Sequence, residues 1–311
     1  MTIQPQAIAP HRVHPGTRPA YVHLRVANLD LQLEFYQKII GLQLHWREGK
    51  SAGLGVAAPA ERWHDLVRLT EIEQGRRYRG VTGIYHFALL LPDRRELARA
   101  IARLFAARWP NYPTDHVMTK TTYLDDPEGN TIELYCESPE DGVFAVDAAG
   151  NFYARWADGR LSNGREPLDL QALFAHLEEE RLAIHFPLSP QTRMGHFHLY
   201  VSDLWETRRF YHEQLGFDDM GVARRFGMGM VSAGGYHHHI GYNIWQGEGA
   251  PPPPEDALGL QHIAFDFPDR TAFQTFQSHL ERLDLPYNRI EEGILLSDPS
   301  QSQVLFREPP L

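Results

Sequence analysis

The chain has 311 residues, of which 42% are hydrophobic, and a formal net charge of -10. This length and composition predict a globular protein with one large core or two ordinary ones. The acidic balance argues against nucleic acid or an anionic membrane as the main partner, because both require concentrated Lys and Arg. The single cysteine, Cys136, excludes an intramolecular disulfide and a cysteine-rich zinc site, and it indicates a reducing compartment. A small-molecule ligand fits this composition better.

The first residues, MTIQPQAIAPHRVHPGTRP, contain no apolar signal core. No later run approaches the roughly 18 apolar residues of a membrane span. We therefore expect the protein in the cytoplasm, with no membrane partner.

Two stretches of the chain recur at a fixed offset. VHLRVANLDLQLEFYQKIIGL from Val22 matches FHLYVSDLWETRRFYHEQLGF from Phe197 at a histidine, a Phe-Tyr pair and a glycine. YHFALLLPDR from Tyr85 matches QHIAFDFPDR from Gln261 at a histidine and a Pro-Asp pair. Self-similarity of this kind indicates repeated supersecondary units. The chain therefore holds four related units, named A, B, A′ and B′ in chain order.

Each unit opens with a strand of alternating polarity, and a helix follows it. Asp93 and Asp203 each precede a glutamate by three residues, a pattern typical of a helix N-cap. The helices of units A and A′ are predicted to end near Gly41 and Gly216, where glycine favours a left-handed cap. Further short strands are predicted at residues 65–72, 131–136, 228–235 and 237–245. Each unit is therefore expected to be βαβββ.

The expected fold class is α+β, with four βαβββ modules paired into two curled-sheet cups. A single unit cannot cover its own sheet, so two units must pair and curl around a shared cavity. We expect an N-terminal pair of modules at residues 19–137, a partly helical connector at residues 138–194 and a C-terminal pair at residues 195–308. The acidic connector also offers a surface for a second subunit, although nothing in the sequence requires a homo-oligomer.

A carboxylate lies in the middle of the predicted strand TIELY. Thr131, Glu133 and Tyr135 share one face of this strand, and Ile132 and Leu134 share the other. A buried and unpaired glutamate is costly, so the carboxylate must be solvated, paired with a cation or bound to a metal.

His86, in the apolar strand YHFALLL, favours the metal. A lone histidine in such a strand is more often a hydrogen-bonded core residue. Together, however, imidazole and the Glu133 carboxylate suit Fe(II), Mn(II) or Zn(II). A third ligand is still required.

The sequence around Glu133 resembles the signature of the extradiol ring-cleaving dioxygenases, which joins His116, Tyr123, Asp126-Pro127, Gly129 and Glu133. The four units resemble the vicinal oxygen chelate superfamily, which includes glyoxalases, bleomycin resistance proteins and extradiol dioxygenases. The stretches MGHFHLYVSDL and SAGGYHHHIGYNIW look most similar to its catechol 2,3-dioxygenase-like branch. One departure is Thr122 before the tyrosine, where an apolar residue is usual.

The resemblance implies a metal held by one histidine from the first strand of one unit, together with a histidine and a glutamate from the first and last strands of its partner. Unit B supplies His86 and Glu133. The matching first-strand position is His196 in unit A′, but Tyr21 in unit A. The implied ligand set is therefore His86, Glu133 and His196.

This ligand set requires unit A′ to pair with unit B. The alternative keeps sequential pairing of A with B, with His23 standing in on the same strand face as Tyr21. Unit B′ offers no complete set, because Leu305 replaces the glutamate and Leu295 replaces the tyrosine, which leaves only His262.

The same resemblance implies Fe(II), with Mn(II) or Zn(II) suiting the same ligands, and it implies a catechol-like aromatic diol and O2 as reactants. His238 matches the acid/base histidine, and Tyr123 and His116 match groups that hydrogen-bond the substrate. Without the resemblance, residues 237–239 would be interpreted as a surface strand and Tyr123 as a core aromatic. A glyoxalase-type metal-dependent lyase or isomerase, and a non-catalytic small-molecule-binding protein, are the alternatives, since fold alone does not fix the reaction.

Overall fold

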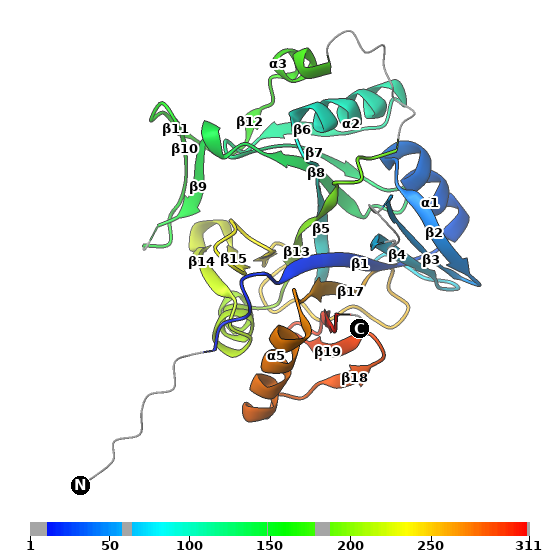
Figure 1. Cartoon of the computed structure of the whole chain (residues 1–311), viewed down its shortest axis with the longest axis vertical. Helices are drawn as coiled ribbons and strands as arrows, with labels where there is room; N and C mark the ends of the chain where they lie inside the picture. The colour runs from blue at the N-terminus through cyan, green and yellow to red at the C-terminus, as the bar shows by residue number, and fades with distance from the viewer. Residues whose placement is uncertain (1–10, 58–63, 148, 178–186, 310–311) are drawn as a thin grey trace.

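The computed structural model describes residues 11–57, 64–147, 149–177 and 187–309. The described strands form two large sheets and one small sheet (Figure 1). The first sheet has the strand order β18-β19-β20-β17-β1-β4-β3-β2, and the second has the order β12-β6-β7-β8-β5-β13-β16-β15-β14. The small sheet has the order β11-β10-β9. This arrangement is mixed α+β, as predicted.

The strands of the first sheet are β1 (Arg18–Val26), β2 (Gln43–Glu48), β3 (Ser51–Val56), β4 (His64–Glu71), β17 (Gly259–Asp266), β18 (Asn288–Ile290), β19 (Gly293–Ser297) and β20 (Gln303–Arg307). Those of the second sheet are β5 (Gly83–Leu90), β6 (Tyr112–Asp115), β7 (Thr119–Asp125), β8 (Thr131–Glu137), β12 (Glu166–Pro167), β13 (Arg193–Tyr200), β14 (Asp218–Ala223), β15 (Met228–Ser232) and β16 (Ile240–Asn243). The small sheet holds β9 (Gly142–Val146), β10 (Phe152–Trp156) and β11 (Leu161–Ser162).

The helices are α1 (Leu29–Phe35), α2 (Arg94–Ala106), α3 (Leu170–Phe174), α4 (Leu204–Arg208) and α5 (Arg270–Arg282). Short π-helical turns continue α1 over Tyr36–Ile40 and α4 over Arg209–Gln214. Short 3-10 turns lie at Pro139–Asp141, Ala175–Leu177 and Arg224–Phe226. No helix in the described ranges is both long enough and apolar enough to cross a membrane.

Each large sheet combines one unit from each half of the chain. In the first sheet β1 of unit A pairs antiparallel with β17 of unit B′, and in the second β5 of unit B pairs antiparallel with β13 of unit A′. The sheets therefore follow the cross-half pairing rather than the sequential alternative. The division into residues 19–137, 138–194 and 195–308 describes the order of units along the chain, and it stays a prediction.

The predicted caps form as expected. The side chain of Asp93 accepts a hydrogen bond from the Glu96 amide at 2.9 Å, and Asp203 accepts one from the Glu206 amide at 2.8 Å. Such bonds satisfy amides that would otherwise lack a partner in the first turn. Gly41, with φ of 93°, takes the left-handed conformation where the first helix of unit A ends.

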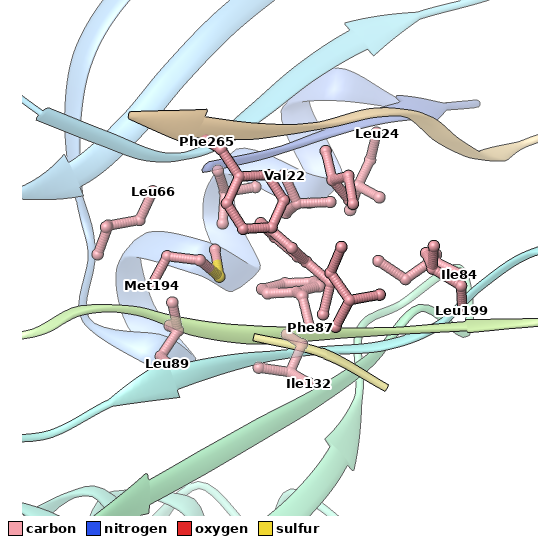
Figure 2. Packing of buried hydrophobic residues seen from close by; sticks show 14 of the residues in the cluster. Val22, Leu24, Leu66, Ile84, Phe87, Leu89, Ile132, Met194, Leu199 and Phe265 are labelled. Carbon is pink, nitrogen blue, oxygen red and sulfur yellow. The ribbon is translucent and has the colours of Figure 1, made fainter. Parts of the chain in front are cut away.

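The main hydrophobic core lies between the two large sheets. Figure 2 shows Val22 and Phe265 from the first sheet approaching Phe87 from the second. The two faces of strand β8 have different surroundings, and only one of them is filled by the core. Its Ile132 and Leu134 belong to this core, whereas Tyr135 packs in a separate cluster on the opposite face. Alternation therefore directs Glu133 away from the core and into the cup of its own sheet.

The connector carries more strand than the sequence predicted. Helix α3 lies within it, but so do β9, β10, β11 and the short β12, which adds to the edge of the second sheet through β6. Figure 1 shows the small sheet beside β14. Residues 178–186 of the expected helical segment lie outside the described residues.

Candidate metal centre

Three neighbouring strands bring His86, Glu133 and His196 together. Strand β5 lies between β8 and β13, and its Ala88 is the register partner of both Glu133 and His196. His86 precedes Ala88 by two residues and therefore lies on the same face. The sheet pairing thus unites residues from units B and A′ that are far apart in the sequence.

The donor atoms of these side chains form a tight triangle. Nε2 of His86 lies 3.2 Å from Oε2 of Glu133, and Nε2 of His196 lies 3.1 Å from the same oxygen. The two Nε2 atoms are 3.2 Å apart. Metal–ligand bonds of about 2.1 Å at right angles would place donor atoms about 3.0 Å apart. The spacing and the N, N, O donor set therefore fit a first-row divalent metal.

Burial makes this triangle costly without a cation. The exposed fractions are 4% for His86 and 3% each for Glu133 and His196. Burial by itself raises the pKa of Glu133, but the adjacent His196 and His86 outweigh it and hold that pKa well below its ordinary value. Burial also lowers the pKa of His86. An ionised carboxylate beside a neutral imidazole is the protonation state that metal binding requires.

Aromatic packing holds the two imidazole rings. Nδ1 of each ring is buried with no hydrogen-bond partner among the described residues. Instead, the ring of His86 packs 4.9 Å from that of Tyr85, and the ring of His196 packs 5.1 Å from that of Tyr135. Gly195 makes the second contact feasible, since a Cβ there would lie 2.1 Å from the Tyr135 hydroxyl.

A cavity of about 340 Å³ opens in front of the three donors. Besides Glu133 and several histidines, its walls are mainly aromatic and thioether side chains: Tyr85, Tyr112, Phe144, Met228, Met230 and Trp245. This volume lies toward the lower end of the range for small-molecule sites, roughly 300–1,000 Å³. The walls suit a flat aromatic ligand.

Tyr123 and His116 lie in this cavity and are hydrogen-bonded to each other. Nε2 of His116 is 2.9 Å from the Tyr123 hydroxyl, and Nδ1 of His116 is 2.5 Å from the carbonyl oxygen of Gly164. Because a carbonyl only accepts, Nδ1 carries the proton and Nε2 accepts from Tyr123. Burial first, and then the charge of Glu133, hold the pKa of Tyr123 well above its ordinary value. The phenol therefore stays protonated.

His238 also lies in the cavity, with its ring 4.2 Å from that of His196. Burial, followed by the nearby His196 and His237, holds its pKa well below the ordinary value, so the imidazole is neutral near pH 7. Its Nδ1 is buried without a hydrogen-bond partner in the described part of the chain. A neutral imidazole in the cavity wall can accept a proton at a ring nitrogen.

His237 was missed from the sequence, although it lines the same cavity. The predicted strand over residues 237–245 is observed only as β16 (Ile240–Asn243). The three histidines precede it in irregular backbone, so the strict alternation of a strand does not apply and both His237 and His238 reach the cavity. His239 turns away, and its Nδ1 accepts from the Ala233 amide at 3.0 Å. His196, His237 and His238 form a second group of closely spaced potential donors.

His23 does not join the centre. It lies on β1 in the other large sheet, where its Nε2 is 2.8 Å from the Thr70 hydroxyl and its register partner is His262. In the second sheet, the register pair that corresponds to His23 and His262 is His198 and His86. His198 lines the cavity but lies outside the His86, Glu133 and His196 group.

Among the described residues, the cup of the first sheet holds no comparable group of donors. In β20, Leu305 is the partner of Ala264 and Leu295, as Glu133 is the partner of Ala88 and Tyr123 in the second sheet. The positive charge in this cup is supplied by an arginine side chain. The guanidinium of Arg68 lies 4.0 Å from the ring centroid of Tyr21 and contacts Glu292 at 2.7 Å.

Comparisons with known proteins agree with this architecture. A family model described as the Glyoxalase/Bleomycin resistance protein/Dioxygenase superfamily matches residues 18–134. The chain is 35% identical over 302 residues to a catechol-2,3-dioxygenase of Bacillus subtilis (strain 168), with 96% of this chain and 95% of that protein covered.

Solved structures show the same fold at low sequence identity. A candidate dioxygenase from Bacillus subtilis subsp. subtilis str. 168 has a TM-score of 0.59 at 12% identity, with 94% of this chain and 86% of that chain covered. Glyoxalase I from Zea mays has a TM-score of 0.53 at 17% identity, with 94% and 92% covered. These two likenesses concern the fold alone. The family match and the extended identity to the catechol-2,3-dioxygenase show that the chain belongs to the glyoxalase/bleomycin resistance protein/dioxygenase superfamily.

Proposed function

We propose that the protein is a metal-dependent extradiol dioxygenase that cleaves the ring of a catechol-like aromatic diol with O2. The observation that carries this proposal is the convergence of His86, Glu133 and His196 at the wall of an aromatic-lined cavity. The 35% identity to a catechol-2,3-dioxygenase supports it. Two imidazoles and one carboxylate are the donor set typical of non-heme Fe(II) oxygenases.

Fe(II) is the proposed metal, with Mn(II) or Zn(II) suiting the same donors; when bound, it would act as a Lewis acid that brings the diol and O2 together. The protein residues bind and orient the substrate. The cavity walls, with Tyr85 and Trp245 among them, can pack against an aromatic ring and exclude water.

Three residues of the cavity are assigned to accepting a proton, donating a hydrogen bond and positioning the donor. Neutral His238 lines the cavity and can take a proton from a substrate hydroxyl at a ring nitrogen. Tyr123 stays protonated, and its single O–H, which Nε2 of His116 accepts in this structure, can turn to donate to a substrate oxygen instead. His116 positions that phenol through its Nε2, because its Nδ1–H is held by the Gly164 carbonyl.

The test is a direct activity assay after anaerobic purification. Metal content is measured first, and the Fe(II)-loaded protein is then mixed with a panel of catechols while O2 uptake and the yellow ring-opened product are followed. We expect both signals with at least one catechol. Methylglyoxal with glutathione is the control substrate. Turnover of that mixture alone would favour a glyoxalase-type enzyme, and turnover of neither would favour a non-catalytic small-molecule-binding protein.

A further inference from the structure

A turn of the connector, residues 162–166, is built into the wall of the cavity. The Gly164 carbonyl accepts a hydrogen bond from His116. The backbone of Glu166 on β12 pairs antiparallel with that of Asp115 on β6. Gly164 has φ of 72°, and a Cβ there would lie 2.7 Å from the ring of Phe152. The turn is therefore fixed by contacts on both sides. The next residue, Arg165, lines the cavity.

Arg165 is the only permanently cationic side chain among the described residues that line this cavity. Its guanidinium lies 6.0 Å from the ring centroid of Trp245, and its charge acts on Tyr85 and Tyr123, which lie on two different strands. The side chain is exposed, and no carboxylate of the described residues forms an ion pair with it. Arg68, in the cup of the other sheet, contrasts with it because it is paired with Asp65 and Glu292.

An unpaired guanidinium beside an apolar cavity is suited to an anionic ligand. Its planar donors match a carboxylate in a bidentate geometry, and the nearby Trp245 ring offers apolar surface to the ring that carries this carboxylate. Elsewhere the walls are mostly aromatic, thioether and imidazole groups, so apart from the proposed metal centre Arg165 is the one permanent cation among the described lining residues that a substrate anion meets. A cavity of about 340 Å³ accommodates one ring with a short substituent.

We infer that Arg165 determines substrate specificity by binding a carboxylate carried on a short side chain of the aromatic substrate. The inference rests on the proposed function, since it names the class of diol that the site prefers. Arg165 is not one of the proposed metal ligands, so its loss should change substrate choice rather than metal binding.

Binding without chemistry gives the first test. The probes are 3-phenylpropanoate and 3-phenylpropanamide, which differ in charge and lack the two hydroxyls, so neither requires ring cleavage. Calorimetry with the purified protein is expected to show the acid bound about tenfold more tightly than the amide. Arg165→Gln is expected to abolish this difference, and Arg165→Lys to restore part of it. Arg160→Gln is the matched control, because Arg160 lies on the same connector, pairs with Asp158 and does not line the cavity.

Turnover gives the second test. For the Fe(II)-loaded protein, kcat/KM for 3-(3,4-dihydroxyphenyl)propanoate is expected to exceed that for its amide by about tenfold. Arg165→Gln should raise KM for the acid and leave the amide unchanged. Equal use of acid and amide by the wild type, with no effect of Arg165→Gln, overturns the inference and leaves the dioxygenase proposal standing. Acid-selective binding that depends on Arg165, without cleavage of any catechol, supports the carboxylate site and overturns the dioxygenase proposal.

Discussion

Glu133 shows how a single residue's surroundings decide its role. A glutamate in the middle of a strand with 3% exposure is tolerated only where positive charge or strong donors face it. Its Oε2 is met by two imidazole nitrogens at 3.1 and 3.2 Å, one from β13 and one from β5, the strand that lies between β13 and β8. A bound divalent cation would stabilise such a cluster, because it would offset the negative charge of the carboxylate and coordinate the lone pair of each imidazole nitrogen.

Removal of a proposed ligand should empty the centre. Glu133→Gln and His196→Ala are each expected to lower bound metal by about tenfold or more, because each deletes one of three converging donors. Metal content after dialysis, measured by elemental analysis, checks this. His23→Ala is the matched control, since His23 lies in the other large sheet. A metal-free His23→Ala protein beside a fully loaded His196→Ala protein would contradict the cross-half ligand set.

The proposed proton acceptor gives a separate prediction. His238→Gln should lower kcat by about a hundredfold while leaving metal content at the wild-type level, because a glutamine keeps the volume but cannot take up a proton. Steady-state O2 uptake and elemental analysis are the two measurements. Wild-type kcat in this variant would place the acid/base group on another residue of the cavity.

At the level of elements, the repeated Phe-Tyr pair links the two units within each half. The hydroxyl of Tyr36, after α1, donates to Asp126 at 3.2 Å, and that of Tyr211, after α4, donates to Asp298 at 3.1 Å. Each aspartate also anchors the turn before the last strand of its unit. Burial raises the pKa of Asp298 to about 6. Sheets therefore pair across halves, while these hydrogen bonds join neighbouring units along the chain.

Loss of these buried donors should destabilise the fold. Tyr36→Phe and Tyr211→Phe are each expected to lower the free energy of unfolding by about 1–3 kcal/mol, because a buried carboxyl group loses a hydrogen-bond partner. Denaturant unfolding at constant pH measures the change. Tyr78→Phe is the comparison, since the Tyr78 hydroxyl bonds Asp256 at the surface and water can replace it. An equal effect in all three variants would show that burial of the bond does not matter.

At the level of the whole molecule, burial of neutral histidines couples stability to pH. In the cup of the first sheet, burial lowers the pKa of His262 to about 4 and, together with His262, lowers that of His23 to about 3. The unfolded chain binds protons at these residues below about pH 6.5, whereas the folded chain does not until the pH is far lower. This stability is fully present above pH 6.5 and is lost as the pH falls toward about 4.

The contribution of one such histidine can be measured. His262→Gln should reduce the loss of unfolding free energy between pH 6.5 and 4 by up to about 3 kcal/mol, since glutamine does not titrate. Denaturant unfolding across that pH range provides the slope. His176→Gln, at an exposed position, should leave the slope unchanged. A wild-type slope in His262→Gln would refute the assignment.

Local chemistry in the sequence was sufficient for the parts of the fold that depend on neighbouring residues. Alternation defined the strand faces around Glu133, the Asp93 cap started α2, and the repeat located four units, because strand periodicity, capping and turns involve only a few consecutive residues. The replacements at Leu295 and Leu305 were also legible, since the register of unit B′ repeats that of unit B.

Only the tertiary structure decided which units share a sheet and what else reaches the cavity. The backbone groups along β5 could form hydrogen bonds with either β13 or β1. The pairing with β13 therefore depends on which apolar side chains are buried between distant units rather than on the local sequence pattern. The same holds for Arg165, which comes from a segment that the sequence marked only as a partly helical connector. His237 was hidden because irregular backbone replaced the predicted strand. The sequence determined the candidate donors, and the packing of distant units determined where they meet.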